Sequence, residues 1–510
     1  MWSWLKSDRA KLCLFWLVLA ALCFVWALIQ FDFDNYCFFD SDFSQYAHNM
    51  LARKNADKLL LVGPASSYFI PVVSPLYYWI IYPFYLLTGG AYFYIHLACF
   101  VYTWVIFLAL AAVLYKRPAY RWSYLLMIAL FCFMPVIMVS ATKMWSPNFV
   151  WQAMVVTWYG LILAPKSKRR VVLSVVSGTA CAAGVSLEPL IIPVAIGFLI
   201  IGAIRLRKNV WPYLISFGVL LLVFWVPTFI TEFGQIIARL LAPRDYFFDP
   251  FVTRLHELLT LPFADFSSYN NYNLIIVYVL ILVPIFWCFK KFWRKKLLQE
   301  AWFQMFLVVL FSSIVTLIPK INMTFWYTTG FATVLILLLI TLPVRIKYLT
   351  GVVLVVAWMR LALVHASFVP RVTATEIEAC VTQACQKMTS NDFHYAVYTD
   401  VIAKDAVLYL LFKEGCLPTT NWENITEDYL EMLTARRHYQ LLVFHDLDTL
   451  QNENDRWPTE WTPPFYVELK PSLDALYTEP IASASCDGDW GWTLYEGKSE
   501  DEGEQDRELR

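Results

Sequence analysis

Charged residues are scarce in this chain of 510 residues. Asp, Glu, Lys and Arg make up 16% of it, whereas ordinary soluble domains carry about 25%, and hydrophobic residues reach 59%. A signal peptide or a single anchor adds only about 20 apolar residues, but the apolar excess continues as far as residue 365. The composition therefore excludes an ordinary soluble protein and predicts many membrane spans.

The chain also lacks the short motifs that mark common soluble enzymes. It contains no GxxxxGK[ST], no GxGxxG after a strand, no HExxH and no CxxC pair. Phosphate-cradling loops and zinc sites need those spacings, so nucleotide-driven transport and zinc chemistry have no support. We predict no cofactor, leave a divalent metal open, and expect no nucleic acid as partner.

Acidic residues are few before residue 366 and abundant after it. Residues 1–365 carry 29 Lys and Arg against 13 Asp and Glu, and residues 366–510 carry 11 against 27. This shift predicts a transmembrane domain over 1–365 and a second domain over 366–496. The charge-rich residues 497–510 are expected to form a disordered tail.

The first domain contains about eleven stretches that can cross a bilayer as helices. Crossing takes roughly 17–25 mainly apolar residues. No small-residue cleavage site follows the first stretch, so we interpret it as an uncleaved span. The predicted spans are Leu12–Phe31, Ala91–Tyr115, Trp122–Ala141, Pro147–Ala164, Val171–Leu187, Pro189–Ile204, Val210–Thr231, Tyr272–Phe289, Ala301–Ile318, Met323–Leu342 and Tyr348–Ala366.

Basic residues alternate between the loops of these spans. The N-terminus and every second loop together contain 20 Lys and Arg, while the much longer opposite loops contain eight. Cytoplasmic loops carry such an excess. We therefore expect a multi-pass protein of a bacterial inner membrane, with its N-terminus in the cytoplasm and residues 366–510 outside.

The outside segments have patterns of their own. In the first outside loop, residues 32–90, apolar residues recur at helical spacing near Phe43, and Ser74–Thr88 is aromatic-rich and too short to span, so both are predicted to be interfacial helices. The C-terminal region alternates strand-like Tyr395–Tyr398 and Gln440–Phe444 with helical stretches, which predicts a small α/β domain. The helical stretches are Ala403–Lys413 and Glu427–Arg436.

Four cysteines of the exported region allow disulfides. Cys380, Cys385, Cys416 and Cys486 lie where bridges can form. They permit two bridges in three connectivities, and four free thiols remain the alternative.

Two acids after the first span are candidates for chemistry. Asp40 and Asp42 open the stretch DSDFSQYAHNMLAR, where a carboxylate at the mouth of an outward-facing cavity can act as a general base on an acceptor hydroxyl. The simpler interpretation is structural, because Asp42 with Gln45 three residues later forms a capping box. From spacing alone the cap is favoured, although one residue can serve both roles.

Three cations and one further acid are predicted near the same face. Lys320 and Arg360 suit an anionic phosphate whose charge grows during reaction, although Arg360 can equally snorkel to ordinary phospholipid. Lys143 is a candidate substrate contact or a solvated loop lysine. Glu188, in the short turn VSLEPLIIP, either contacts substrate or caps the helix that follows beside Pro189.

The order of features in the first domain resembles a known group of membrane enzymes. After one span come D-x-x-x-Y-A, from Asp42 to Tyr46-Ala47, then Gly63-Pro64, and then SPLYYWIIYPFYLLTGG before the second span. This order resembles the GT-C type of membrane glycosyltransferase, in particular the dolichyl-phosphate-mannose protein mannosyltransferase and aminoarabinose transferase group. Trp145-Ser146-Pro147-Asn148 resembles a W-N-P element of bacterial relatives. Lys320 through Tyr327 resembles the late K-x-x-x-Y stretch that approaches the lipid phosphate.

The resemblance implies both a fold and a reaction. The fold is an α-helical polytopic membrane protein with a small C-terminal extracytoplasmic α/β domain. The reaction is inverting transfer of a sugar from a polyprenyl-phosphate donor to an acceptor lipid, polysaccharide or protein, with Asp42 as the base and Lys320 and Arg360 on the departing phosphate. Tyr46, Trp145, Lys143 and Glu188 are the candidate substrate contacts.

Two other function classes stay open. A lipid-carbohydrate transporter or flippase predicts repeated halves and polar residues at mid-membrane, whereas the polar candidates here gather at one face. A polysaccharide polymerase or ligase is marked by outside loops rich in arginine and histidine. The segment Glu232–Asn271 keeps that alternative open because it contains Arg239, Arg244, Arg254 and His256.

Overall fold

The computed structural model divides the chain into two compact units. Unit 1 comprises Met1–Phe31 and Leu59–Phe368, and unit 2 comprises Asp32–Lys58 and Val369–Arg510. The structure describes residues 7–31, 47, 50, 51, 61, 63, 73–90, 92–115, 117–134, 149–241, 282–290, 297, 300–317, 329–343, 345–365, 374–387, 393–398, 410, 411, 413–416, 440–446, 477–485 and 490–497.

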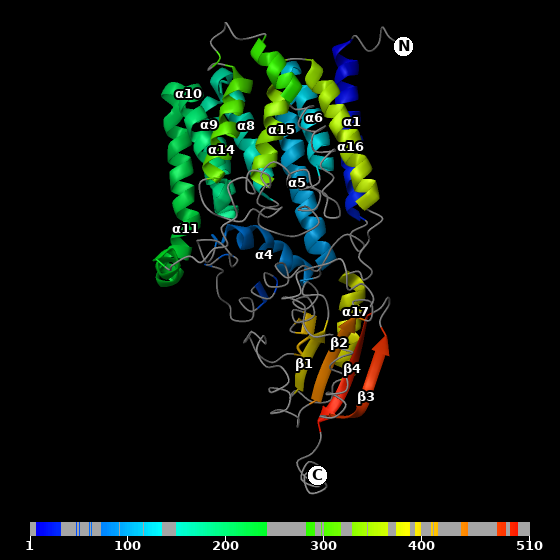
Figure 1. Ribbon diagram of the computed structural model, residues 1–510. Coiled ribbons are helices and arrows are strands. Elements are labelled where there is room, and N and C mark those ends of the chain that lie inside the picture. Colours follow the sequence, from blue (N-terminus) through cyan, green and yellow to red (C-terminus); the bar gives the residue numbers. More distant parts are fainter. Residues whose placement is uncertain are drawn as a thin grey trace. The chain divides into compact units, whose positions relative to one another are not determined.

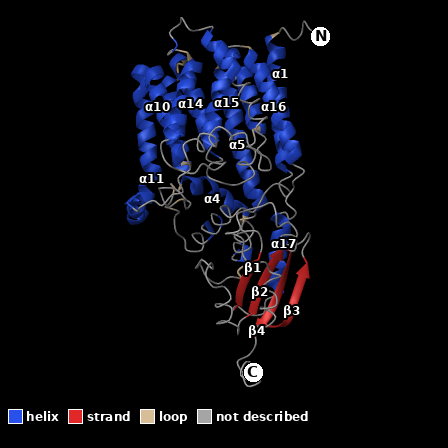
Figure 2. Cartoon of the chain, in the orientation of Figure 1, coloured by secondary structure: helices blue, strands red, loops and turns tan. Residues whose placement is uncertain are grey.

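Unit 1 is a bundle of apolar helices that run side by side (Figures 1 and 2). Two helical stretches of the described residues, Arg170–Leu187 and Pro189–Gly234, are long and apolar enough to cross a membrane. The bundle is built from α1 (Asp8–Phe31), α5 (Tyr92–Leu114), α6 (Pro118–Phe133), α8 (Val150–Leu163), α9 (Arg170–Leu187), α10 (Ile192–Leu206), α11 (Val210–Leu241), α14 (Ala301–Leu317), α15 (Thr329–Thr341) and α16 (Ile346–His365).

These helices follow most of the predicted spans closely. The span predicted over Trp122–Ala141 is wrong in its bounds, because α6 begins at Pro118 and ends at Phe133, where Met134 takes extended backbone angles. The span predicted over Val210–Thr231 ends at a kink in α11, because Glu232 has the non-helical angles φ −119° and ψ 17°. A second helical stretch follows the kink and reaches Leu241. The structure describes only the last part of the eighth predicted span, Tyr272–Phe289. Residues 282–290 are all helical.

Glycines bring three neighbouring helices into close contact. A Cβ added to Gly160 of α8 would lie 2.0 Å from Ser177 Oγ on α9. A Cβ added to Gly178 of α9 would lie 2.3 Å from the Tyr213 carbonyl oxygen at the start of α11. Small residues at such positions let helix backbones approach closely, so α9 is held between α8 and α11.

A short helix, α4 (Leu76–Thr88), lies across one end of the bundle (Figure 1). It confirms the helix predicted over Ser74–Thr88. One face, with Tyr77, Tyr78 and Tyr85, is buried, while Leu87 on the other is 82% exposed. The helix ends at Gly89, whose positive φ of 66° suits a residue without a side chain.

Unit 2 contains a four-stranded sheet and the helix α17. The described residues at the end of the helix predicted over Ala403–Lys413, which are Leu410, Leu411 and Lys413, are helical as well. The strand order is β1-β2-β4-β3; β1 pairs in parallel with β2, and β4 pairs in antiparallel with β2 and β3. The side chains of Trp492 and Leu494 on β4 are buried. The elements are α17 (Ala374–Lys387), β1 (Phe393–Tyr398), β2 (Gln440–Asp446), β3 (Tyr477–Ser485) and β4 (Trp490–Gly497).

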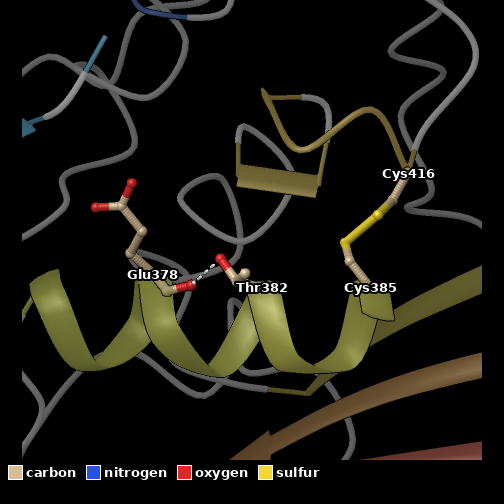
Figure 3. Close-up of a disulfide and its surroundings, with 4 residues drawn as sticks. All are labelled: Glu378, Thr382, Cys385 and Cys416. Carbon is tan, nitrogen blue, oxygen red and sulfur yellow. Dashed lines mark hydrogen bonds between the residues drawn. A yellow bond between two sulfur atoms is a disulfide. The ribbon is translucent and has the colours of Figure 1, made fainter. Parts of the chain in front are cut away.

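A disulfide fixes the end of α17. Cys385 bridges to Cys416, 31 residues later (Figure 3). One turn earlier on the helix, Thr382 Oγ1 donates to the Glu378 carbonyl oxygen at 2.8 Å. The Glu378 carboxylate also pairs with Lys413, so α17 and the segment around Cys416 are linked twice.

Cys380 is disulfide-bonded as well. Every other cysteine of the described residues is either free or part of the Cys385–Cys416 bridge. The Cys385–Cys416 bridge is part of only one of the three connectivities predicted above, and that connectivity pairs Cys380 with Cys486.

Candidate functional site at the α4 end of the bundle

Most of the residues predicted from the sequence fall outside the described part of the chain. Asp40, Asp42, Tyr46, Lys143, Trp145 and Lys320 lie outside it, and so do residues 403–409 and 427–436 of the predicted C-terminal helices. Arg360 lies on α16, but its side chain is not described. Glu188 is fully described, and the site is built around it.

Glu188 lies between the end of α9 and the short 3-10 helix η4 (Pro189–Ile191). Its side-chain oxygen Oε1 accepts a hydrogen bond from the Leu190 backbone N–H at 3.2 Å. The residue has extended backbone angles and precedes Pro189, as an N-cap residue before a proline does. The capping role that the sequence allowed is thereby confirmed, and Glu188 is 6% exposed.

Burial changes the acidity of this carboxyl group. Burial raises the pKa of Glu188 from 4.5 to about 7, and the hydrogen bond from the Leu190 N–H opposes part of the rise. A desolvated carboxylate with one hydrogen bond is a costly group to keep in a fold.

The raised pKa of Glu188 predicts how the stability of the protein depends on pH. Between pH 4.5 and about 7 the folded protein holds a proton that the unfolded chain has lost, so the free energy of unfolding falls as pH rises and reaches its low value above pH 7. Gln cannot ionise, yet its carbonyl oxygen can accept from Leu190 N–H. Glu188→Gln is therefore expected to be more stable than wild type at pH 8, by up to about 3 kcal/mol.

Thermal unfolding of both proteins in one detergent at pH 5 and pH 8 checks this expectation. The advantage of the variant should shrink towards pH 4.5. A difference that stays the same at both pH values would show that the ionisation of Glu188 is not its cause.

The segment before α4 is anchored to the bundle near Glu188. The Val73 carbonyl oxygen accepts from Gly63 N–H at 3.2 Å and from Thr228 Oγ1 of α11 at 3.4 Å. The next residue, Ser74, donates from Oγ to the Ser186 carbonyl oxygen at 2.9 Å. These bonds join the Gly63 segment, α9 and α11 at one point, which we call the Val73–Ser74 anchor.

A second polar contact joins α8 and α5 at the same end. Gln152 Nε2 donates to Thr103 Oγ1 at 3.1 Å, and both side chains are buried. Beside it the Phe149 ring lies between the rings of Tyr77 on α4 and Tyr102 on α5, with centroids 6.1 and 5.8 Å away. Aromatic packing therefore connects α4 to the start of α8.

We call this region the α4 end of the bundle, where α4 lies, α8 begins and α9 finishes. All Lys and Arg residues of unit 1 whose side chains the structure describes lie at the opposite ends of these helices, in the segments predicted to be cytoplasmic. Lys347 is an example, and it donates to Ser123 Oγ at 2.9 Å and to the Ile340 carbonyl oxygen at 2.7 Å. The described side chains of the α4 end thus offer hydrogen-bond acceptors and hydroxyls but no cation.

Sequence reasoning missed Ser186, Gln152 and the Val73–Ser74 anchor. Ser186 stands two residues before Glu188, but a serine in an apolar helix carries no pattern of its own. Ser74 and Ser186 are 112 residues apart, so their contact depends on the tertiary fold.

Comparison with known proteins identifies the fold. No protein-family model matches the sequence, and no curated protein matches it. The structure of ArnT from Cupriavidus metallidurans in the apo state is similar with a TM-score of 0.59 and 12% identity, over 95% of this chain and 98% of that one. The structure of the same protein bound to undecaprenyl phosphate is similar with a TM-score of 0.51 and 12% identity, over 94% and 97%. The chain therefore has the helical fold of the two ArnT structures, which confirms the resemblance predicted from the sequence at the level of the fold.

Proposed function

We propose that this chain is an inverting glycosyltransferase that moves a sugar from a polyprenyl-phosphate donor to an acceptor hydroxyl at the outer face of the membrane. The observation that carries the proposal is the likeness to ArnT over nearly the full length of both chains. One of the two ArnT structures is bound to undecaprenyl phosphate, and a lipid-phosphate donor agrees with the absence of nucleotide-binding motifs from the sequence.

In the proposed reaction Asp42 takes the proton of the acceptor hydroxyl as its oxygen attacks the anomeric carbon. The bond from that carbon to the phosphate oxygen breaks on the opposite side, and its electron pair stays on the departing polyprenyl phosphate. A phosphate monoester leaving group needs charge stabilisation more than protonation. Lys320 and Arg360 supply it, and Asp40 is the alternative base.

The remaining candidates bind the sugar or the acceptor. Tyr46 and Trp145 offer faces on which a sugar ring can stack, and Lys143 and Glu188 offer polar contacts. The acceptor is a lipid, a polysaccharide or a protein. In this proposal the N-terminus lies in the cytoplasm and the C-terminal α/β domain lies outside a bacterial inner membrane, with these groups facing the same outer side.

Mass spectrometry of the purified protein tests the proposed function. The lipid extract is expected to contain a polyprenyl-phosphate sugar, and adding acceptor should convert it to polyprenyl phosphate. Apo protein is then incubated either with the lipid extract or with nucleotide sugars. It should retain the polyprenyl-phosphate sugar from the extract and should retain no nucleotide sugar. Retention of a nucleotide sugar, or no lipid-linked sugar after both treatments, would contradict the proposal.

A further inference from the structure

The hydroxyl group of Ser186 is enclosed without a hydrogen-bond partner. The residue is 0% exposed, and its Oγ meets no donor or acceptor among the described residues. Elsewhere on α9 the buried serines are satisfied: Ser174 Oγ and Ser177 Oγ each donate at 2.8 Å to the carbonyl oxygen four residues earlier. Ser186 makes no such bond, so its hydroxyl keeps hydrogen-bonding capacity that burial makes costly to leave unused.

Glu188, two residues later, also has hydrogen-bonding capacity that the structure does not use. A carboxylate can accept about four hydrogen bonds, and among the described residues this one accepts a single bond, from Leu190 N–H. No described Lys or Arg side chain pairs with it. Six per cent of the residue stays exposed, whereas Ser186 is fully buried.

Gln152 adds a third group at the same level of the bundle. Its Nε2 donates to Thr103, but its Oε1 is buried without a partner in the structure. A Cβ added to Gly184 on α9 would meet the neighbours of Gln152 on α8, Met154 and Ala153. The antiparallel pairing of α8 and α9 therefore places Gln152 near the level of Ser186.

We propose that Glu188, Ser186 and Gln152 form a specificity site that binds the hydroxyl or amino groups of the sugar carried by the donor, and that this site does not bind the phosphate. The inference rests on the proposed function and assigns these residues a part of its substrate. What the three groups lack is hydrogen-bond donors, and sugar hydroxyl and amino groups supply donors. An ionised phosphate has only acceptors, and the Glu188 carboxylate repels it.

Such a site disfavours a ligand that lacks hydrogen-bond donors, because the buried acceptors of the site then stay unpaired when that ligand binds. A sugar-binding role also explains the position of Glu188. Its buried carboxyl group destabilises the fold at neutral pH, but it is needed at this turn to bind the sugar. A residue that served only as a cap would not need to ionise, because a neutral side-chain oxygen accepts the same N–H.

The test compares binding of two probes to the full chain in phospholipid vesicles at pH 8. The probes are undecaprenyl phosphate and the same lipid phosphate carrying a hexose or a pentose. We expect wild type to prefer a sugar-bearing probe, and Glu188→Gln and Ser186→Ala each to lower that preference roughly tenfold. Affinity for undecaprenyl phosphate alone should stay within about twofold. The control Ser174→Ala removes a buried, bonded hydroxyl from the opposite end of α9 and should leave the preference unchanged.

Thermal unfolding separates binding from folding. Ser186→Ala removes a buried hydroxyl with no partner and is expected to melt at or above the wild-type temperature. Loss of stability in step with loss of binding would make Ser186 a structural residue and overturn the proposal.

Three further outcomes would also overturn it. Equal losses for both probes would show that the residues act on the lipid phosphate. Unchanged donor binding with a raised KM for the acceptor would assign them to the acceptor. If both variants keep the wild-type preference for the sugar-bearing probe, Glu188 and Ser186 do not bind the sugar. Wild-type protein that binds neither probe would instead remove the proposed function itself.

Discussion

Asp42→Asn is expected to lower the rate of sugar transfer by roughly 10²–10⁴, the usual contribution of a general base, while the protein folds and melts as wild type does. Asn and Asp are about equal as N-caps, so the substitution keeps the capping role that the sequence allows. An amide cannot take the proton of the acceptor hydroxyl. The variant therefore separates the two roles of one residue.

The measurement is initial transfer rate per folded protein, with yield and melting temperature recorded for each variant. Full activity would show that Asp42 is only a cap, and activity lost in proportion to folded protein would remove the support for catalysis. Asp40→Asn and the double variant are the matched controls, because Asp40 is two residues away. A defect confined to Asp40→Asn would move the base there.

The helices of unit 1 could be predicted from the sequence because their signals are local. An apolar stretch that follows basic residues and ends before Glu188 fixes α9 to within one residue, predicted as Val171–Leu187 and observed as Arg170–Leu187. The predicted end of the seventh span at Thr231 likewise falls beside Glu232, whose non-helical backbone angles form the kink in α11. The second helical stretch, from the kink to Leu241, was not predicted.

The candidate site was only partly predictable for the same reason. Glu188 stands out in the sequence because a lone acid in an apolar turn is unusual, and its cap is made by a residue two positions away. The contacts around it join residues far apart in the chain, such as Thr228 and Val73, which are 155 positions apart. No spacing rule brings those residues together, and the unpaired state of Ser186 appears only once its neighbours are placed.

The Val73–Ser74 anchor allows a test of how strongly the segment before α4 controls activity. Gly63 donates its N–H to the Val73 carbonyl oxygen. A Cβ added there would lie 2.1 Å from the Ser74 carbonyl oxygen and 2.5 Å from that of Val73. Both are backbone atoms, so no side-chain rotation can relieve the contact, and the two segments must move apart by about an ångström.

Gly63→Ala is therefore expected to displace the anchor from Ser186 and Thr228 while the long helices stay packed. A misplacement of about 1 Å far from the reacting atoms can cost on the order of 10² in rate, so we expect a loss of that size in kcat for transfer.

Gly218→Ala on α11 is the matched control, because nothing lies within 4 Å of its added Cβ and alanine favours a helix over glycine. Transfer rate and melting temperature are measured for both variants. Wild-type turnover in Gly63→Ala would show that the anchor does not position the site, and equal losses in Gly218→Ala would show that the effect is not specific to the anchor.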